Sequence, residues 1–204
     1  MSGGMPDRDV ADVWLVRLDH PRQWLEPTAA EAERAARLVS STLRQRYLRS
    51  HAALREILGK YTDAPLDFAA AEHGKPYIPG VPDLKFNLSH SYEMALVAVC
   101  QGVEVGADIE RLRPMRECLA IAERFFPPAE AAALTECPAD EREARFFHLW
   151  TRIEAKLKAR GIGLYGAGTD PDGEWTVLPI DAGPDYAAAL AACRSGISMQ
   201  IYHL

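Results

Sequence analysis

The chain has 204 residues, of which 48% are apolar and 25% are charged, a composition typical of a folded globular protein rather than a disordered one. Its net charge of −6 disfavours non-specific nucleic-acid binding, which needs a basic surface, and no apolar run reaches the length that spans a membrane. Met1 is followed by small and charged residues instead of an apolar signal segment, so we expect a cytoplasmic protein.

The N-terminal part predicts one strand followed by two helices. The apolar run 13–18 indicates the strand. Thr28, with Glu31 three residues later, gives a capping-box pattern for a helix that runs to about residue 38. A second helix is expected to end at Gly59 and to direct its apolar side chains towards the core; these are Leu43, Tyr47, Leu54, Ile57 and Leu58.

The helical segment 34–55 is locally basic. Its arginines are at positions 34, 37, 44, 46, 49 and 55. A basic face on an acidic protein suits a compact polyanion such as a nucleotide. For any single arginine, a solvated helix face is the alternative interpretation.

The middle of the chain predicts strands. Residues 66–71 are expected to form a strand, and Gly74–Lys75–Pro76 has the composition of a turn. Residues 84–90 and 94–100 are two strand-like runs whose short separation predicts a hairpin. Residues 103–109 predict a third strand, which leads into a pair of acids.

The last part of the chain predicts helices and then three more strands. Helical patterns cover 114–126, 129–135 and a long segment that opens at Pro138 and is closed by Gly161. Glycines follow as far as Gly173 and indicate a mobile loop. The final strands are expected at 174–180, 186–193 and 198–203, so a helix followed by three strands occurs twice, which indicates an α+β fold.

Three acids and a lysine in the second half indicate a site for a metal and a phosphate. Asp108 and Glu110 are two residues apart in a strand, so both side chains point to the same face. Glu154 lies at the border of the buried stripe of the long helix, and Lys158 lies one turn beyond it. Oxygen ligands without a cysteine and histidine cluster favour magnesium holding a phosphate ester. Taken alone, Asp108 and Glu110 also fit a solvated strand end.

Four motifs in this order resemble the 4'-phosphopantetheinyl transferases of the Sfp type. The motifs are Gly74–Lys75–Pro76, Phe86–Asn87–Leu88–Ser89–His90–Ser91, Val105–Gly106–Ala107–Asp108–Ile109–Glu110, and Trp150 followed by Glu154–Ala155 and Lys158. Each motif alone is a weak signal, and their order over about 90 residues makes the combination specific. The resemblance extends upstream to Arg46–Tyr47–Leu48 and 51–55, so it covers most of the chain.

The resemblance implies two similar α+β halves related by a pseudo-twofold axis, with the active site at their interface. We expect residues 1–102 to bind the nucleotide of coenzyme A and residues 103–204 to hold magnesium and the carrier protein. The implied reaction transfers the 4'-phosphopantetheine arm of coenzyme A to a serine of an acyl or peptidyl carrier protein and releases 3',5'-ADP. Since both halves lie in one chain, we expect a monomer.

The resemblance also assigns residue roles. Asp108, Glu110 and Glu154 match the acids of the metal site. Glu154 is also a candidate for the base that deprotonates the serine, and Lys158 is a candidate for holding or protonating the leaving phosphate. The residues that match coenzyme A contacts are Arg46, Lys75, Ser89 and His90, with Arg34 a looser match. The alternative for Ser89 and His90 is a polar strand end that only satisfies backbone groups.

One departure from the family pattern motivates an alternative function. Many family members have lysine before the glutamate of the last motif, where this chain has Ile153. The neighbouring Arg152 points about 100° away around the helix and is an imperfect replacement. The alternative is a degenerate homologue that binds coenzyme A or a carrier protein without turnover. A magnesium-dependent phosphohydrolase is a third hypothesis, for which the chain lacks the usual aspartate nucleophile motif.

Overall fold

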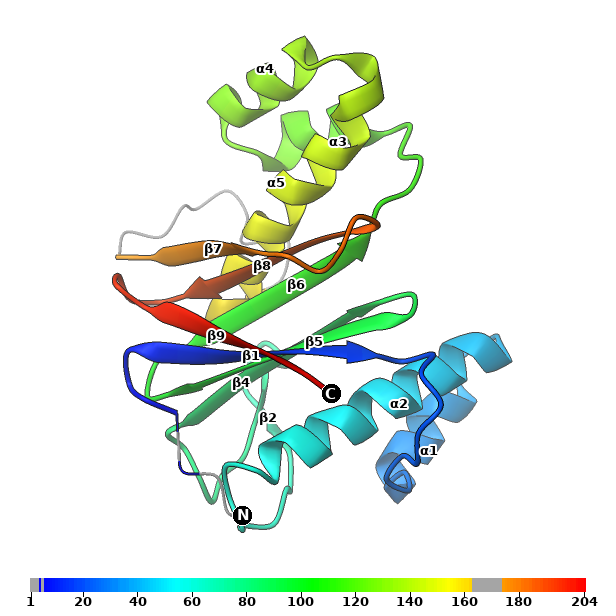
Figure 1. Ribbon diagram of the computed structural model, residues 1–204, viewed down its shortest axis with the longest axis vertical. Helices are drawn as coiled ribbons and strands as arrows, with labels where there is room; N and C mark the ends of the chain where they lie inside the picture. The colour runs from blue at the N-terminus through cyan, green and yellow to red at the C-terminus, as the bar shows by residue number, and fades with distance from the viewer. Residues whose placement is uncertain (1–3, 5, 163–173) are drawn as a thin grey trace.

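The computed structural model describes residues 4, 6–162 and 174–204, which form two sheets packed face to face (Figure 1). The first sheet has the strand order β4 (Leu84–Ser91), β5 (Met94–Gln101), β1 (Val10–Arg17) and β9 (Ser198–His203). The second has the order β6 (Val105–Arg111), β8 (Tyr186–Ala192) and β7 (Thr176–Ile180). A small ribbon pairs β2 (Ala69–Ala70) with β3 (Pro76–Tyr77). The mixed α+β fold class is therefore confirmed.

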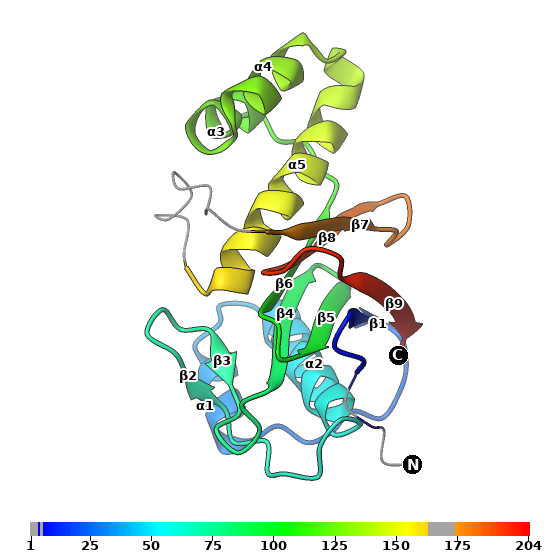
Figure 2. The same ribbon diagram turned by 90° about the vertical axis from the view of Figure 1, so that its left-hand side faces the viewer.

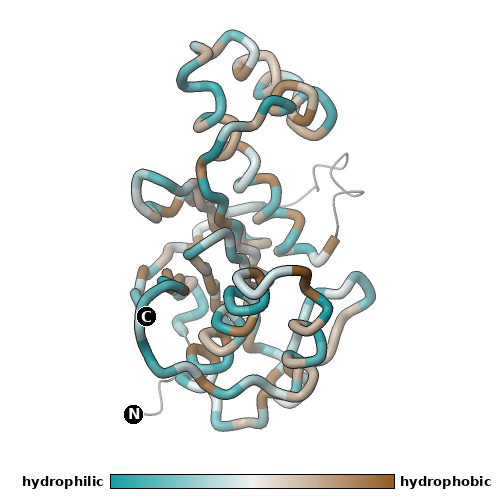
Figure 3. The backbone as a smooth tube through the Cα atoms, turned by 90° about the vertical axis from the view of Figure 1, so that its right-hand side faces the viewer, coloured by the Kyte–Doolittle hydropathy of each residue, from teal (hydrophilic) through white to brown (hydrophobic). Residues whose placement is uncertain are grey.

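Helices cover the outer faces of both sheets (Figures 1 and 2). On the first sheet they are α1 (Ala29–Ala36) and α2 (Ser41–Leu58); on the second it is α5 (Ala139–Arg160). The short helices α3 (Cys118–Phe125) and α4 (Pro128–Glu136) lie beside the N-terminal part of α5. Apolar residues recur between polar ones along the helices (Figure 3), as expected when a helix buries one face. None of the helices in the described ranges is long and apolar enough to cross a membrane.

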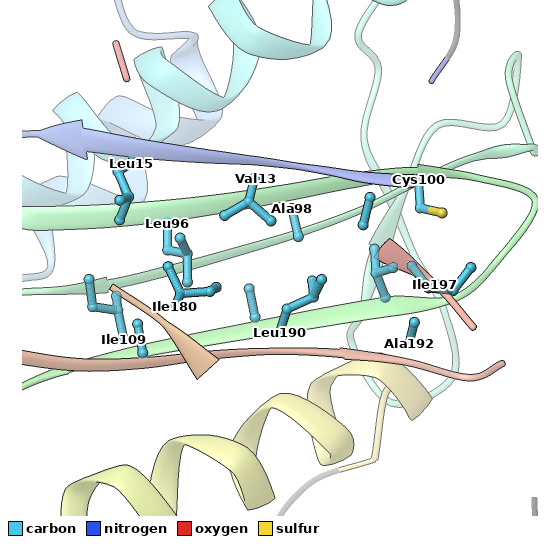
Figure 4. Packing of buried hydrophobic residues seen from close by; sticks show 14 of the residues in the cluster. Val13, Leu15, Leu96, Ala98, Cys100, Ile109, Ile180, Leu190, Ala192 and Ile197 are labelled. Atoms are coloured by element: carbon cyan, nitrogen blue, oxygen red, sulfur yellow. The ribbon is translucent and has the colours of Figure 1, made fainter. Parts of the chain in front are cut away.

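The main core lies between the two sheets (Figure 4). Leu15 and Leu96 from the first sheet face Ile109 and Leu190 from the second, and all four are buried. Strand β8 shows how alternation builds the layers: residues 188, 190 and 192 face this core, whereas Ala189 and Ala191 face α5.

A second core lies between α2 and the first sheet. The C-terminal half of α2 supplies Leu54, Ile57 and Leu58, which pack against Val97 on β5. The expectation that Leu43 also points into the core is wrong, because its side chain is 44% exposed at the start of the helix, outside this cluster.

Helix ends follow the local sequence signals. The predicted capping box is present, since Thr28 accepts from the Glu31 N–H and Glu31 accepts from the Thr28 N–H. Gly59 ends α2, and Gly161 ends α5 with φ 68°, a left-handed conformation that glycine adopts without strain. The glycine-rich loop expected to be mobile falls on 163–173 and lies outside the described residues.

Two predicted elements are shorter than expected. Of the strand predicted at 66–71, only β2 pairs. Helix α3 begins at Cys118 instead of residue 114, and the preceding Met115 N–H donates to the Glu143 side chain of α5 at 2.9 Å.

The last strand crosses between the two halves of the chain. Strand β9 pairs in parallel with β1, with Val13 opposite Ile201, and so belongs to the first sheet. The first sheet thus contains three strands from the first half of the sequence, together with β9 from the C-terminal end. All three strands of the second sheet come from the second half. The pseudo-twofold axis and the boundary at residue 102 stay predictions.

Candidate active site

The two sheets meet along the edge between β4 and β6, where polar side chains replace the usual backbone ladder. Alternate residues of β4 accept hydrogen bonds from backbone N–H groups of β6. The bonds run from Ala107 to Asn87 Oδ1 (2.9 Å), from Ile109 to Ser89 Oγ (3.4 Å) and from Arg111 to Ser91 Oγ (3.1 Å). The spacing of the Asn-Leu-Ser-His-Ser motif is thus the two-residue period of a strand, which fixes β4 against β6.

At the centre of this edge, Asp108, Ser89 and Lys158 form a closed hydrogen-bonded group. The Ser89 hydroxyl donates to Asp108 Oδ1 at 2.9 Å. The Lys158 ammonium donates to the same Asp108 oxygen at 2.6 Å and to Ser89 Oγ at 3.0 Å. Asp108 is only 3% exposed, so its charge is held by these contacts rather than by bulk water. Three separate motifs therefore converge on one carboxylate.

The close approach of α5 to β6 brings Lys158 and Glu154 to the strand. A Cβ atom on Gly106 would lie 2.1 Å from the Ala155 carbonyl oxygen and 2.3 Å from the Ala159 nitrogen. Only glycine fits at this crossing. Small alanines on the helix complete the contact, so α5 runs directly over β6.

The other two predicted metal-site acids lie around the same group. Glu110 accepts hydrogen bonds from the Ser91 hydroxyl (3.0 Å) and from Arg113 Nη1 (3.1 Å). Burial raises the pKa of Glu154, and the nearby negative charges of Asp108 and Glu110 raise it further, whereas Lys158 lowers it. The three carboxylates are therefore close enough for their charges to interact.

The acids have oxygen atoms available for a cation. Among the described residues, the buried Asp108 Oδ2 atom has no hydrogen-bond partner. No group of three acidic, histidine or cysteine residues is already arranged for a metal ion within 4, 6–162 and 174–204. An unsatisfied buried carboxylate oxygen beside two more carboxylates is nevertheless the donor chemistry that suits magnesium.

The predicted nucleotide-binding cations Arg34 and Arg46 lie on the helices of the first half. Arg46 on α2 pairs with Glu93 at 2.6 Å and stacks over the Tyr92 ring, with the guanidinium 5.0 Å from the ring centroid. Partial burial lowers the pKa of His90, as do the positive charges of Lys158 and Arg46. His90 is therefore close enough to both Lys158 and Arg46 for their charges to act on it. Arg34 is exposed near the end of α1 and lies outside the acidic group.

Lys75 lies at a different place from the other predicted contacts. Its ammonium donates to Glu104 Oε2 (2.5 Å), the Val105 carbonyl (3.1 Å) and the Ala159 carbonyl (2.7 Å). These partners are at the start of β6 and the end of α5. Its expected contact with coenzyme A stays a prediction, and the structure gives Lys75 three protein partners instead.

Two further residues of the site were not singled out by the sequence. Ser91 binds Glu110 as Ser89 binds Asp108, and the two-residue spacing of these serines on β4 is the signal that could have found it. His51 lies on α2 with its ring 4.2 Å from that of Tyr47 and close enough to His90 for their charges to interact.

Ile153 takes part in packing rather than in the acidic group. It packs against the cluster of α3, α4 and α5 that includes the buried Phe146 and Phe147. The neighbouring Arg152 faces α4, where it lies 3.5 Å from Glu130. The position of the usual lysine is therefore filled by an apolar side chain without an evident disturbance of the helix.

Comparison with known proteins gives consistent matches. Residues 104–195 match the family described as the 4'-phosphopantetheinyl transferase superfamily. The chain is 36% identical over 167 residues to the 4'-phosphopantetheinyl transferase HetI of Nostoc sp., and the aligned region covers 76% of this chain and 70% of that protein. It is 34% identical over 160 residues to a 4'-phosphopantetheinyl transferase of Bacillus subtilis, covering 68% and 70% of the two chains. With Sfp of Bacillus subtilis it shares 40% identity over 97 residues, 48% of this chain and 42% of Sfp.

Proposed function

Since the chain belongs to the 4'-phosphopantetheinyl transferase superfamily, we propose that it transfers the 4'-phosphopantetheine group of coenzyme A to a serine of an acyl or peptidyl carrier protein. The serine oxygen forms a bond to the phosphorus that carries pantetheine. The bond from this phosphorus to the other phosphate breaks, and 3',5'-ADP leaves. The protein must take up the serine proton and stabilise the charge on the leaving phosphate.

The closed group of Asp108, Ser89 and Lys158 is the observation that carries this proposal. It joins the end of α5 to β4 and β6 through bonds of 2.6 to 3.0 Å. A substrate phosphate that enters here meets an ammonium already fixed in place, so little reorganisation is needed at the moment of reaction. Lys158 is therefore the residue that we assign to the leaving phosphate.

Glu154 is the residue that we assign to the serine proton. Burial, followed by the charge of Asp108, raises its pKa above that of an ordinary glutamate. A carboxylate with a raised pKa is a stronger base than an exposed one and is better matched to proton transfer near neutral pH. Its place one turn before Lys158 on α5 puts the base and the ammonium on one face of the helix.

We assign Asp108, Glu110 and Glu154 to a magnesium ion. The support is the unpartnered Asp108 Oδ2 atom and the closeness of the three carboxylates: burial raises the pKa of Glu154, and the charges of Asp108 and Glu110 raise it further. When bound, magnesium supplies positive charge that neutralises the negative charge on the diphosphate. For the remaining phosphate and the nucleotide we assign Arg46, His90, Ser89 and, more peripherally, Arg34, because the charges of Lys158 and Arg46 both act on His90, and those of His90 and Arg34 both act on His51.

The transferase activity is tested by mass spectrometry of a purified apo carrier protein. The carrier is incubated with this protein, coenzyme A and magnesium, and a parallel sample contains EDTA. We expect the carrier to gain the mass of one phosphopantetheine group and EDTA to suppress the gain. No gain with several types of carrier, together with measurable binding of coenzyme A, would support the degenerate binding protein instead, and Ile153→Lys would be the first substitution to test.

The assignment of Asp108 is tested by Asp108→Asn, which removes the charge while keeping the size of the side chain. We expect the transfer rate to fall by about 100-fold or more, because the neutral amide no longer holds the Lys158 ammonium or a magnesium ion firmly at the reacting phosphate, while weak coenzyme A binding remains. Asp67→Asn is the control, since Asp67 is exposed and lies 41 residues before Asp108 along the chain. Transfer at the wild-type rate by a folded Asp108→Asn protein would refute the metal and Lys158 assignments.

A further inference from the structure

Lys75 is a largely buried cation whose donors are all used inside the protein. The side chain is 12% exposed, and the ammonium lies within hydrogen-bond distance of Glu104, Val105 and Ala159 at 2.5, 3.1 and 2.7 Å. A lysine ammonium has three N–H donors, and each has an acceptor here. A phosphate of coenzyme A could be bound only if one of these contacts were broken.

The three acceptors belong to two elements of the active site. Glu104 and Val105 are at the start of β6, three to four residues before Asp108. Ala159 is next to Lys158, and its carbonyl is among the last four of α5, which have no partner within the helix. The positive charge of Lys75 also lies at the negative end of the helix dipole.

The stem of Lys75 packs against the end of the same helix. A Cβ atom on Gly161 would lie 3.1 Å from Lys75 Cβ and 3.4 Å from its Cδ. The lysine thus contacts both the last turn of α5 and the residue that ends it. Because the turn between β2 and β3 carries this side chain, a segment from the first half of the chain reaches the helix of the second half.

We propose that Lys75 is a positioning residue whose ammonium fixes the end of α5 to the start of β6 and does not bind a phosphate of coenzyme A. The inference rests on the proposed function, since its consequence for catalysis acts through Lys158 and Asp108. With Lys75 in place, the Lys158–Asp108 contact keeps its 2.6 Å length. Without Lys75, the last turn of α5 can move relative to β6, and Lys158 no longer points steadily at the reacting phosphate.

The chain offers a matched control. Lys85 pairs with the other oxygen of Glu104, at 2.7 Å. Lys85→Met removes a lysine–Glu104 ion pair but leaves the carbonyl contacts of Lys75 intact. Lys75→Met removes both kinds of contact, so the difference between the two variants isolates the fixation of α5.

Lys75→Arg separates positioning from phosphate binding. Arginine binds phosphate at least as well as lysine, so a residue that contacts coenzyme A would tolerate this change. The three acceptors of Lys75 surround one nitrogen atom. The flat guanidinium of arginine spreads its donors over three nitrogen atoms, so it cannot bond to all three acceptors in this arrangement. We therefore expect Lys75→Arg to lose activity although it keeps the charge, and this variant also serves if Lys75→Met does not fold.

The experiment measures kcat and the KM for coenzyme A with saturating apo carrier. We expect kcat of Lys75→Met and Lys75→Arg to fall by about 10- to 100-fold while the KM changes little, because a small misplacement of a catalytic group has an effect of that size. Lys85→Met should keep both values. A raised KM with unchanged kcat in Lys75→Met, or a fully active Lys75→Arg, would overturn the proposal.

Hydrogen exchange provides a readout that does not depend on activity. In both Lys75 variants the amides at 157–162 should exchange faster than in the wild type, and those of α2 should not. If the wild type transferred nothing, the proposed function would fail while this measurement would still decide whether Lys75 fixes α5. Unchanged exchange at 157–162 in the folded variants would refute the positioning role.

Discussion

His51 is a histidine that the fold keeps neutral between α1 and α2. Burial lowers its pKa to about 4, and the charges of His90, Arg34 and Arg55 act in the same direction. Glu31, whose Oε1 lies 3.9 Å from the ring Nδ1, favours the protonated form but does not outweigh burial. Lowering the pH therefore destabilises the native state through His51.

The sign of the effect on stability follows from the two pKa values. An unfolded histidine has a pKa near 6.5, and the folded one is about 4, so the unfolded chain takes up the proton first as the pH falls. The contribution to stability is present above pH 6.5 and is lost between pH 6.5 and 4. From a shift of this size we expect a loss of about 2 kcal/mol between pH 7 and pH 5.

The substitution His51→Gln isolates this loss. Glutamine does not titrate, so the difference in unfolding free energy between wild type and variant should move by about 2 kcal/mol in favour of the variant from pH 7 to pH 5. Urea unfolding at both pH values measures it. His148→Gln is the control, because it removes an exposed histidine of α5 away from the α1–α2 interface. If the difference in unfolding free energy between the wild type and His51→Gln were the same at both pH values, His51 would not be held neutral by partial burial.

At the scale of elements, the crossing of α5 over β6 depends on the missing side chain of Gly106. In Gly106→Ala, the new methyl group would need to displace backbone atoms of Ala155 and Ala159 that lie 2.1 and 2.3 Å away. Backbone cannot rotate out of the way as a side chain can. We expect a loss of about 2 kcal/mol or more in the free energy of unfolding, and a larger relative loss of transfer, because Lys158 moves with the helix.

Urea unfolding and the transfer assay measure the two effects of Gly106→Ala. Gly80→Ala is the matched control: a Cβ atom there has nothing within 4 Å, so the change should be neutral or stabilise by up to about 1 kcal/mol. A Gly106→Ala protein with wild-type stability would mean that α5 does not pack on β6 as closely as described.

The sequence predicts elements well where the signal is local. The capping box at Thr28, the glycine that ends α5 and the alternation of the β4–β5 hairpin all lie within a few residues of the feature that they define. The segment before α3 could not be predicted in the same way, because its Met115 N–H donates to Glu143, 28 residues further on. Leu43 has the helical spacing of a core residue. The helix sequence alone does not show whether the sheet extends far enough to cover its side chain.

The same distinction holds for the site. The motifs predict Asp108 as a metal ligand, Ser89 as a coenzyme A contact and Lys158 at the leaving phosphate, and the structure places the three side chains in contact. The environment of Lys75 could not be predicted, because two of its three acceptors are backbone carbonyls, which every residue has. Sequence shows that a lysine is present but not whether its charge is already satisfied.

At the scale of the whole molecule, the halves predicted as 1–102 and 103–204 share one core. Strand β9 comes from the second half but pairs with β1 of the first. The inter-sheet cluster combines Leu15 and Leu96 with Ile109 and Leu190, so separating the halves would expose both of its faces to water. Each such side chain contributes about 1.5 to 3 kcal/mol when fully buried. Each half on its own would therefore lose the inter-sheet contacts that bury its apolar face.

We therefore expect that fragments 1–102 and 103–204, produced separately, do not fold, even though the residues proposed for the nucleotide and for magnesium divide between them. Fragment 1–102 lacks the parallel partner of β1, and this leaves an open strand edge beside an uncovered apolar face, a combination that favours aggregation. Dispersion of amide signals in NMR spectra and the cooperativity of thermal unfolding would measure the outcome, with the full chain as reference. A dispersed spectrum and a cooperative transition for either fragment would show that the halves are independent domains.

If both fragments stay unfolded while the full chain unfolds in a single transition, the site between β4 and β6 is held together by the same core that stabilises the molecule. Weakening that core by Leu190→Ala should then lower the thermal stability of the whole chain in one step.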